Sequence, residues 1–240
     1  LWCFLISLVL GQDPTVDLEI KRCLKGLEDK DYSIRYNSIT KLTTIVINKN
    51  LPTDQLLPHI KRLFKDENES VRHQAVWGLS ELVRLKGEGL DDFKEAFNSK
   101  EERIRSLLLN ALCLDVLENV MLKVEPIIFK GLKDESSKIR YRAAESIWRF
   151  SEKSEKAREL YSKAESELIN LLKKDKDAEV REHSIKALMF VSTSHDKIIS
   201  LAIELFEKDE NPIVLNTACK ILAKYGAKAK KAIPVFIKAI

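Results

Sequence analysis

Two aspartates and an arginine lie close together in the segment 175–188, which has the sequence DKDAEVREHSIKAL. Aspartates at this spacing could hold a calcium ion, and Arg181 could bind a phosphate or a carboxylate. An EF-hand calcium loop that began at Asp175 would need glycine at its sixth position and glutamate at its twelfth. The chain has Val180 and Lys186 at those positions. The sequence therefore rejects a metal site here and leaves the role of the arginine to be explained.

The same pattern recurs as DKDYSIRYNSITKL (29–42), DENESVRHQAVWGL (66–79) and DESSKIRYRAAESI (134–147). Alignment on the arginine gives six stations: Arg35, Arg72, Arg105, Arg140, Arg181 and, in sixth place, Leu215. Successive stations are 37, 33, 35, 41 and 34 residues apart, which is the length of a helical hairpin with its turns. A single active site does not recur in this way, so we predict a structural role for the arginines.

Each station lies near the start of a predicted amphipathic helix, the B helix. Ile or Val precedes each station, and Leu or Ile follows each station seven residues later. A small residue lies three residues after the station, except at Leu108 in the third repeat. These offsets fall on one face of an α-helix. A second amphipathic run, the A helix, lies ahead of each B helix, so the sequence predicts a repeated helical hairpin.

Prolines and capping residues agree with this assignment. Pro58, Pro126 and Pro234 recur at one place in the A helices, where an interior proline would cost about 3 kcal/mol, so we expect each near a helix start or at a bend. Four residues before the station lies a residue whose side-chain oxygen can cap the B helix. These residues are Asp31, Asn68, Ser136, Asp177 and Asn211.

An aspartate also lies six residues before four of the stations, namely Asp29, Asp66, Asp134 and Asp175. We predict that each arginine binds the turn of its own repeat or of the neighbouring repeat. The alternative is a row of arginines that binds phosphate or carboxylate ligands. The third repeat has Ser99 in place of the aspartate, and the sixth has Leu215 in place of the arginine. These two stations should therefore be the least regular.

The pattern D-x-D/N-x-x-V/I-R-x-x-A/S-x-x-x-L resembles the HEAT-repeat family, in the short form also seen in HEAT-like proteins related to phycobilin lyases. The resemblance begins near residue 16 and continues to residue 240. It implies an all-α fold, a right-handed α-α superhelix (solenoid) of about six hairpins plus a truncated seventh, with the B helices on the concave side. It also implies a structural ladder between repeats. The ladder residues are Asp29, Arg35, Asp66, Arg72, Arg105, Asp134, Arg140, Asp175 and Arg181.

The predicted repeat array occupies residues 13–240. Its approximate repeats are 13–50, 51–86, 87–121, 122–154, 155–195 and 196–227, with a partial repeat at 228–240. Residues 1–12 are strongly apolar and fit either the tail of a secretory signal peptide or the end of an upstream helix. The location stays unknown: it is cytoplasmic or, if residues 1–11 are a signal-peptide remnant, exported. A run of about ten apolar residues is too short to cross a bilayer, so we expect no transmembrane span.

Motifs for catalysis or cofactor binding are absent from the sequence. The chain has no G-x-G-x-x-G, P-loop, H-E-x-x-H, C-x-x-C or G-x-S-x-G motif. None of its histidines has a His, Cys or acidic residue four positions later, the spacing of a metal-binding pair on one helix face. We therefore expect no enzyme activity, no metal and no cofactor.

The net charge of +4 is unevenly distributed. Residues from 211 onward contain six lysines and no acid, so residues 1–210 carry about −2. Binding of a nucleic-acid backbone calls for Lys or Arg repeated along one groove. The sequence therefore disfavours a nucleic-acid partner.

Positions one and five after each station point away from the predicted core. They include Tyr36, His73, Trp77 and Tyr141, with Arg142 beside the last. Aromatic and arginine side chains dominate the binding energy of protein interfaces, so these five are the candidate binding residues on the concave face. In the alternative, Trp77 and Tyr141 pack in the seam between repeats.

The sequence thus favours a non-catalytic scaffold that binds a protein or peptide on the concave B-helix face. The alternatives are a nucleic-acid-binding or DNA-glycosylase-like HEAT module and an enzyme similar to the bilin lyases. A glycosylase would have Trp77, Tyr141, Trp148 and Glu145 as its candidate residues, but the basic channel that it needs is missing. The sequence identifies neither the partner nor the oligomeric state.

Overall fold

The computed structural model describes residues 14–54 and 56–238, and every regular element in these ranges is a helix. The predicted signal or upstream-helix segment, residues 1–12, lies outside the described residues. The helices are α2 (Pro14–Gly26), α3 (Tyr32–Asn48), α4 (Leu57–Leu63), α5 (Glu69–Lys86), α6 (Leu90–Ala96), α7 (Glu102–Leu112), α8 (Glu118–Lys123), α9 (Glu125–Gly131), α10 (Ser137–Lys153), α11 (Glu155–Tyr161), η1 (Ser162–Ala164), α12 (Glu165–Lys174), α13 (Ala178–Val191), α14 (His195–Lys208), α15 (Pro212–Tyr225), η2 (Gly226–Ala232) and α16 (Ile233–Lys238).

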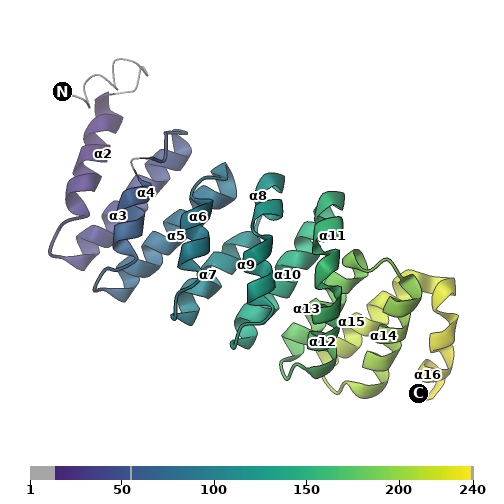
Figure 1. Cartoon of the computed structure of the whole chain (residues 1–240). Coiled ribbons are helices and arrows are strands. Elements are labelled where there is room, and N and C mark those ends of the chain that lie inside the picture. Colours follow the sequence, from purple (N-terminus) through teal and green to yellow (C-terminus); the bar gives the residue numbers. More distant parts are fainter. Residues whose placement is uncertain (1–13, 55, 239–240) are drawn as a thin grey trace. The chain divides into compact units, whose positions relative to one another are not determined.

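The helices group into two compact units. Unit 1 extends to Ala111 and includes Asp115–Leu117, and unit 2 comprises Leu112–Leu114 and the chain from Glu118 onward. In unit 1, α3 packs against α2 and α5, and α5 also packs against α4 and α6 (Figure 1). In unit 2, α13 packs against α10, α12 and α15, and α14 packs against α15. Each unit is therefore a series of hairpins whose B helices contact one another.

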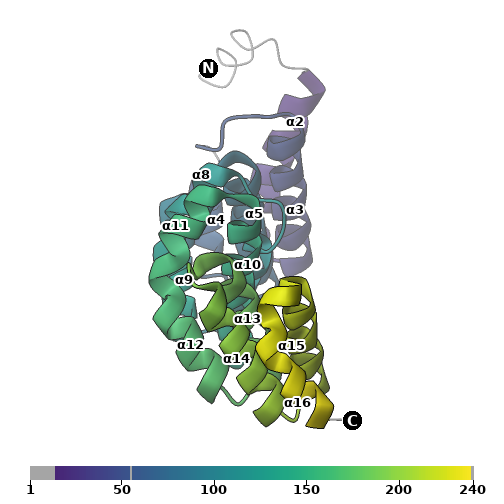
Figure 2. The same cartoon turned by 90° about the vertical axis from the view of Figure 1, so that its right-hand side faces the viewer.

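Unit 2 has two layers of helices. Figure 2 shows α9 and α12, which are A helices, on one side of the B helices α10, α13 and α15. The A and B layers enclose the apolar face predicted from the offsets around each station. The residues seven positions after the stations are all buried: Leu42, Leu79, Leu112, Ile147, Leu188 and Leu222. Burial of one such side chain contributes about 1.5–3 kcal/mol to folding, so this face holds each hairpin together.

One predicted core position differs. Ile34, directly before the first station, is 42% exposed, whereas its equivalents Val71, Ile139, Val180 and Val214 are fully buried. The predicted helix core is otherwise confirmed at this offset.

The predicted capping residues set the starts of the B helices. The side chains of Asp31, Asn68, Asp177 and Asn211 each accept a hydrogen bond from a backbone amide in the first turn of the helix. Ser136 precedes α10 but makes no such bond through its side chain. Four of the five predicted caps are confirmed.

The prolines explain short A helices. Pro58 and Pro126 each lie in the first turn of their helices, α4 and α9, as predicted. Proline lacks an amide hydrogen and cannot continue a helix that precedes it. The A segment of the fourth hairpin accordingly consists of two helices, α8 and α9.

Candidate functional site

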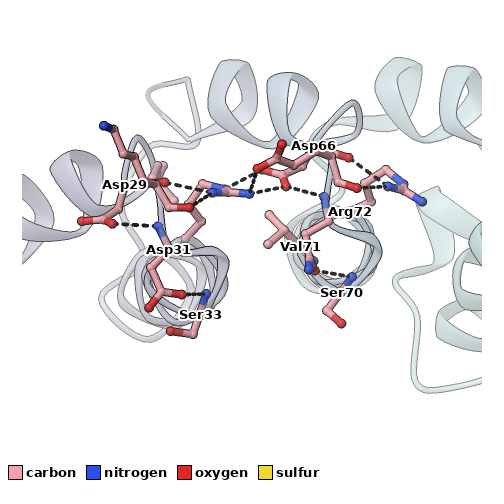
Figure 3. A network of polar contacts seen from close by, with 12 residues as sticks. Asp29, Asp31, Ser33, Asp66, Ser70, Val71 and Arg72 are labelled. Atoms are coloured by element: carbon pink, nitrogen blue, oxygen red, sulfur yellow. Dashed lines mark hydrogen bonds and ion pairs between the residues drawn. The ribbon is translucent and has the colours of Figure 1, made fainter.

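Figure 3 shows two successive turns of unit 1, which carry Asp29 and Asp66. The Arg35 guanidinium joins these two turns. Its Nε and Nη2 donate to the two carboxylate oxygens of Asp66 at 2.8 and 2.7 Å, and its Nη1 donates to the carbonyl oxygens of Asp29 and Lys30 at 2.9 and 3.0 Å. Asp66 also accepts from the amide of Asn68 at 2.9 Å. All three guanidinium nitrogens are in use, which leaves little capacity to bind a ligand.

Unit 2 contains two contacts of the same kind. Arg140 donates to Asp175 from Nε at 2.6 Å and from Nη2 at 3.0 Å, and Arg181 donates to Asp209 at 2.7 and 2.9 Å. The third nitrogen of Arg181 donates to the carbonyl oxygen of Asp175 at 2.9 Å, and that of Arg140 donates to the carbonyl of Asp134 at the same distance. Asp175 therefore links two consecutive contacts. We call each such arginine-carboxylate contact a rung.

The carboxylates of these three rungs are buried and charged. The Asp66, Asp175 and Asp209 side chains are 7%, 4% and 6% exposed. Burial acts to raise the pKa of each carboxyl, but the hydrogen bonds from the arginine and from a backbone amide outweigh it, so each pKa lies below its usual value. The hydrogen bonds to Asp66 and Asp209 raise the pKa of Arg35 and Arg181, respectively. Both partners therefore stay ionised at neutral pH.

Asp209 was not among the predicted ladder residues. It lies six positions before Leu215, where the repeat pattern places an acid, but that repeat lacks its own arginine. The structure shows why this arginine is dispensable for the contact: the acid of one repeat pairs with the arginine of the preceding repeat. The expected irregularity of the sixth station therefore does not extend to its carboxylate.

The third station is irregular, as expected from Ser99. Arg72 pairs with Glu101 instead of an aspartate, at 3.1 Å from Nε and 3.5 Å from Nη2. The Ser99 hydroxyl accepts from the Glu101 amide at 3.1 Å, which is the bond that Asp66 makes in the preceding turn. The Glu101 side chain is 40% exposed. The rung is thus longer and more open to solvent, although Arg105 still donates to the carbonyl of Ser99 at 2.9 Å.

The proposed binding residues of unit 1 differ in exposure. Tyr36 on α3 and Trp77 on α5 are 37% and 38% exposed, whereas His73 is 8% exposed. The His73 Nε2 lies 3.6 Å from carboxylate oxygens of Glu69 and Glu101, and burial lowers the pKa of its imidazole. Glu101 belongs to the turn that follows α6, so His73 packs against that turn, whereas Tyr36, one residue after the first station, stays exposed.

In unit 2, Tyr141 and Arg142 lie together on α10. The Tyr141 ring centroid is 4.7 Å from that of His183 on α13, and the Arg142 guanidinium lies 4.5 Å from the Tyr141 centroid. Arg142 also donates to Glu145 at 2.6 Å. Tyr141 therefore packs in the seam between two B helices, where burial raises the pKa of its phenol to about 12. Trp77 in unit 1 keeps a larger exposed surface.

A second group of rings and cations lies on the unit 2 B helices outside the five candidate binding residues, and only its Trp148 was named from the sequence, in the glycosylase alternative. Trp148 on α10 lies 5.3 Å from the Arg149 guanidinium and 4.8 Å from Lys186 Nζ, measured from the ring centroid. Phe190 on α13 lies 5.4 Å from Lys224 Nζ. These residues occupy positions five to nine after their stations. Positions eight and nine share a helix face with positions one and five, so extending the periodicity would have found Arg149, Phe190 and Lys224.

A groove of about 620 Å³ lies beside the rungs of unit 2, with Lys173, Glu204 and Lys208 in its lining. Glu204 accepts from Lys173 at 2.9 Å and from Lys208 at 3.0 Å, so these charges are already paired. Within the described ranges, no group of three or more His, Cys, Asp or Glu side chains is placed to hold a metal ion. None of the described helices has the length and apolar character needed to cross a membrane.

Protein-family models match most of the repeats described above. A family model of HEAT repeats matches residues 124–202 and 165–240, and a second model, of the single HEAT repeat, matches residues 56–85. The chain belongs to the HEAT-repeat family. No curated protein sequence matches this HEAT-repeat protein.

Solved structures with the same fold include natural and designed repeat proteins. A designed armadillo repeat protein in complex with peptide (KR)4 is 17% identical, with a TM-score of 0.62 over 87% of this chain and 100% of that chain. Kap121p bound to Pho4p is 12% identical, with a TM-score of 0.66 over 91% of this chain and 24% of that chain. An engineered protein is 15% identical, with a TM-score of 0.60 over 85% of this chain and 95% of that chain. These likenesses concern the fold, and they confirm the predicted all-α repeat class.

Proposed function

We propose that this HEAT-repeat protein is a non-catalytic scaffold that binds a protein or peptide partner along its B-helix face. The observation that carries the proposal is the exposure of two large aromatic side chains, Tyr36 and Trp77, at 37% and 38% on the adjacent helices α3 and α5. Side chains of this type supply much of the binding energy at protein interfaces. Two solved structures of the same fold contain a bound peptide or protein, which supports the same role here.

The geometry of the arginines supports a scaffold rather than a row of ligand-binding groups. Arg35, Arg140 and Arg181 each donate to a buried carboxylate and to carbonyl oxygens of their own turn. A ligand anion would have to displace these bonds and leave a buried aspartate unpaired, which is costly. The arginines therefore hold the hairpins in place and leave recognition to the B-helix face.

Peptide selection tests this function. A random-peptide display library is panned against the immobilised protein, and selected peptides are measured by fluorescence anisotropy. Trp77→Ala should weaken the binding free energy of a selected peptide by about 2 kcal/mol or more and leave the melting temperature of the protein nearly unchanged. Leu85→Ala is the matched control, because Leu85 lies on the same helix and is 41% exposed. Failure to select any peptide, or a stability loss of about 3–5 kcal/mol in Trp77→Ala with unaltered affinity, would contradict the proposal.

A further inference from the structure

The B helices of unit 2 carry a row of aromatic rings with cations against them. Arg142 lies 4.5 Å from the Tyr141 centroid, and Arg149 and Lys186 lie 5.3 and 4.8 Å from the Trp148 centroid. Phe190 has Arg158 at 5.8 Å and Lys224 at 5.4 Å. An aromatic ring beside a cation offers both an apolar contact surface and a positive charge that is fixed in place.

The central part of this face has an excess of positive charge. We define the cationic band as the charged and aromatic residues five to nine positions after the stations of α10, α13 and α15: Glu145, Trp148, Arg149, Lys186, Phe190, Lys220 and Lys224. Its one carboxylate, Glu145, is buried and accepts from Arg142 at 2.6 Å and from Arg149 at 2.9 Å. Lys220 and Lys224 are exposed, and α15 contains no acidic residue. The band therefore presents cations without an exposed carboxylate.

We propose that the cationic band of unit 2 binds an acidic segment of the partner peptide or protein. This inference rests on the proposed scaffold function and specifies the chemistry of the partner. Lys186 already pairs with Glu182 at 2.7 Å. Carboxylates of the partner would pair with Lys220 and Lys224, while its apolar groups contact Trp148 and Phe190. Charge complementarity of this kind sets the specificity and the association rate of a complex.

The observations favour an acidic polypeptide over a nucleic acid. Binding to a phosphate backbone calls for cations repeated along the whole groove. Here Glu179 and Glu152 are exposed on the same helical face, near the first turn of α13 and the last turn of α10. Their charges would repel a phosphate backbone that extended past the band. A short acidic segment can place its charges between them.

Three fluorescein-labelled probes test the proposal on the full chain: an alternating Asp-Glu octapeptide, the peptide (KR)4 and an oligothymidylate of equal length. The acidic peptide should bind most tightly, and its binding should weaken as salt is added. The variant Lys220→Glu with Lys224→Glu should weaken this binding about tenfold or more. The control Lys228→Glu with Lys230→Glu makes the same change in net charge at exposed residues of η2 and should leave it unchanged.

The proposal is overturned if the acidic peptide does not bind, if (KR)4 or the oligothymidylate binds as tightly, or if the control weakens binding equally. The milder variant Lys220→Ala with Lys224→Ala guards against misfolding, and circular dichroism checks each protein. Peptide selection distinguishes a failure of the acidic-partner proposal from a failure of the scaffold function. Selected peptides that depend on Trp77 and lack acidic residues would leave the scaffold function standing and remove the acidic partner.

Discussion

The rung between Arg140 and Asp175 and the rung between Arg72 and Glu101 differ in how the carboxylate is held. Asp175 is 4% exposed and accepts from the arginine at 2.6 and 3.0 Å and from the Asp177 amide at 3.0 Å. In the turn of Glu101 two residues make these bonds. Ser99 accepts the hydrogen bond from the backbone amide, and Glu101 pairs with Arg72. The short side chain of Asp175 makes both bonds, and its bond to the Asp177 amide fixes the carboxylate independently of the arginine. A longer and exposed side chain has to be ordered by the arginine itself, which costs conformational entropy.

A regular rung should therefore stabilise the hairpins more than the irregular one, and neither should contribute as much as a side chain of the apolar core. Leu188→Ala sets the scale, because Leu188 is fully buried in α13 of unit 2. The variant should lower the free energy of unfolding by about 2–5 kcal/mol through lost burial and a cavity. Urea denaturation measures the change. A loss smaller than that of any rung variant would reverse this order.

Removing the arginines separates the two rungs. Arg140→Ala should cost about 1–3 kcal/mol of unfolding free energy, because Asp175 is left buried without its partner. Arg72→Ala should cost about 0.2–1 kcal/mol, because Glu101 is 40% exposed and solvent screens its charge. Both values come from urea denaturation at neutral pH. Equal losses would show that burial of the carboxylate does not decide the strength of a rung.

The regular rungs should also make stability depend on acid pH. The pKa of Asp175 is lowered in the folded state, so its contribution is complete above the unfolded pKa of about 3.9 and is lost as pH falls through the folded pKa. Unfolding free energies at successive pH values should therefore fall below about pH 4. Asp175→Asn should be less stable than the parent at neutral pH and should lose less on acidification. An unchanged acid loss in this variant would remove the rung as its cause.

The irregular turn can also be tested by a gain of stability. Ser99→Asp combined with Glu101→Asn rebuilds the D-x-N arrangement of Asp66 and Asn68 in the preceding turn. The new aspartate should accept from both Arg72 and the backbone, and the asparagine should cap α7. A gain of about 0.5–1.5 kcal/mol in unfolding free energy is expected. Ser99→Asp alone is the control, because it keeps Glu101 beside the new carboxylate. A double variant no more stable than the parent would contradict the explanation of the open rung.

The hairpins, their cores and most of their caps could be predicted from the sequence, because helix periodicity and capping chemistry are local. Each rung joins two repeats. Aspartates were sought in repeats that have an arginine at the station, so Asp209 was overlooked because its own repeat has Leu215 there. Glu101 was overlooked because it occupies a capping position and performs another task there. Exposure was the least predictable property. His73 is buried because the next turn covers it, and an offset along one helix does not reveal what the neighbouring hairpin covers.

Arg181→Ala tests most directly whether the arginine row holds the fold or binds the ligand. Arg181 donates to Asp209 at 2.7 and 2.9 Å and to its own turn at 2.9 Å, so its loss should lower the unfolding free energy by about 1–3 kcal/mol. Lys176→Ala removes an exposed cation from the same turn and should change little. Stability and peptide affinity are measured on the same preparation of each variant. The structural account predicts reduced stability with an unchanged Kd of the folded protein for a selected peptide, and unchanged stability with lost peptide binding would contradict it.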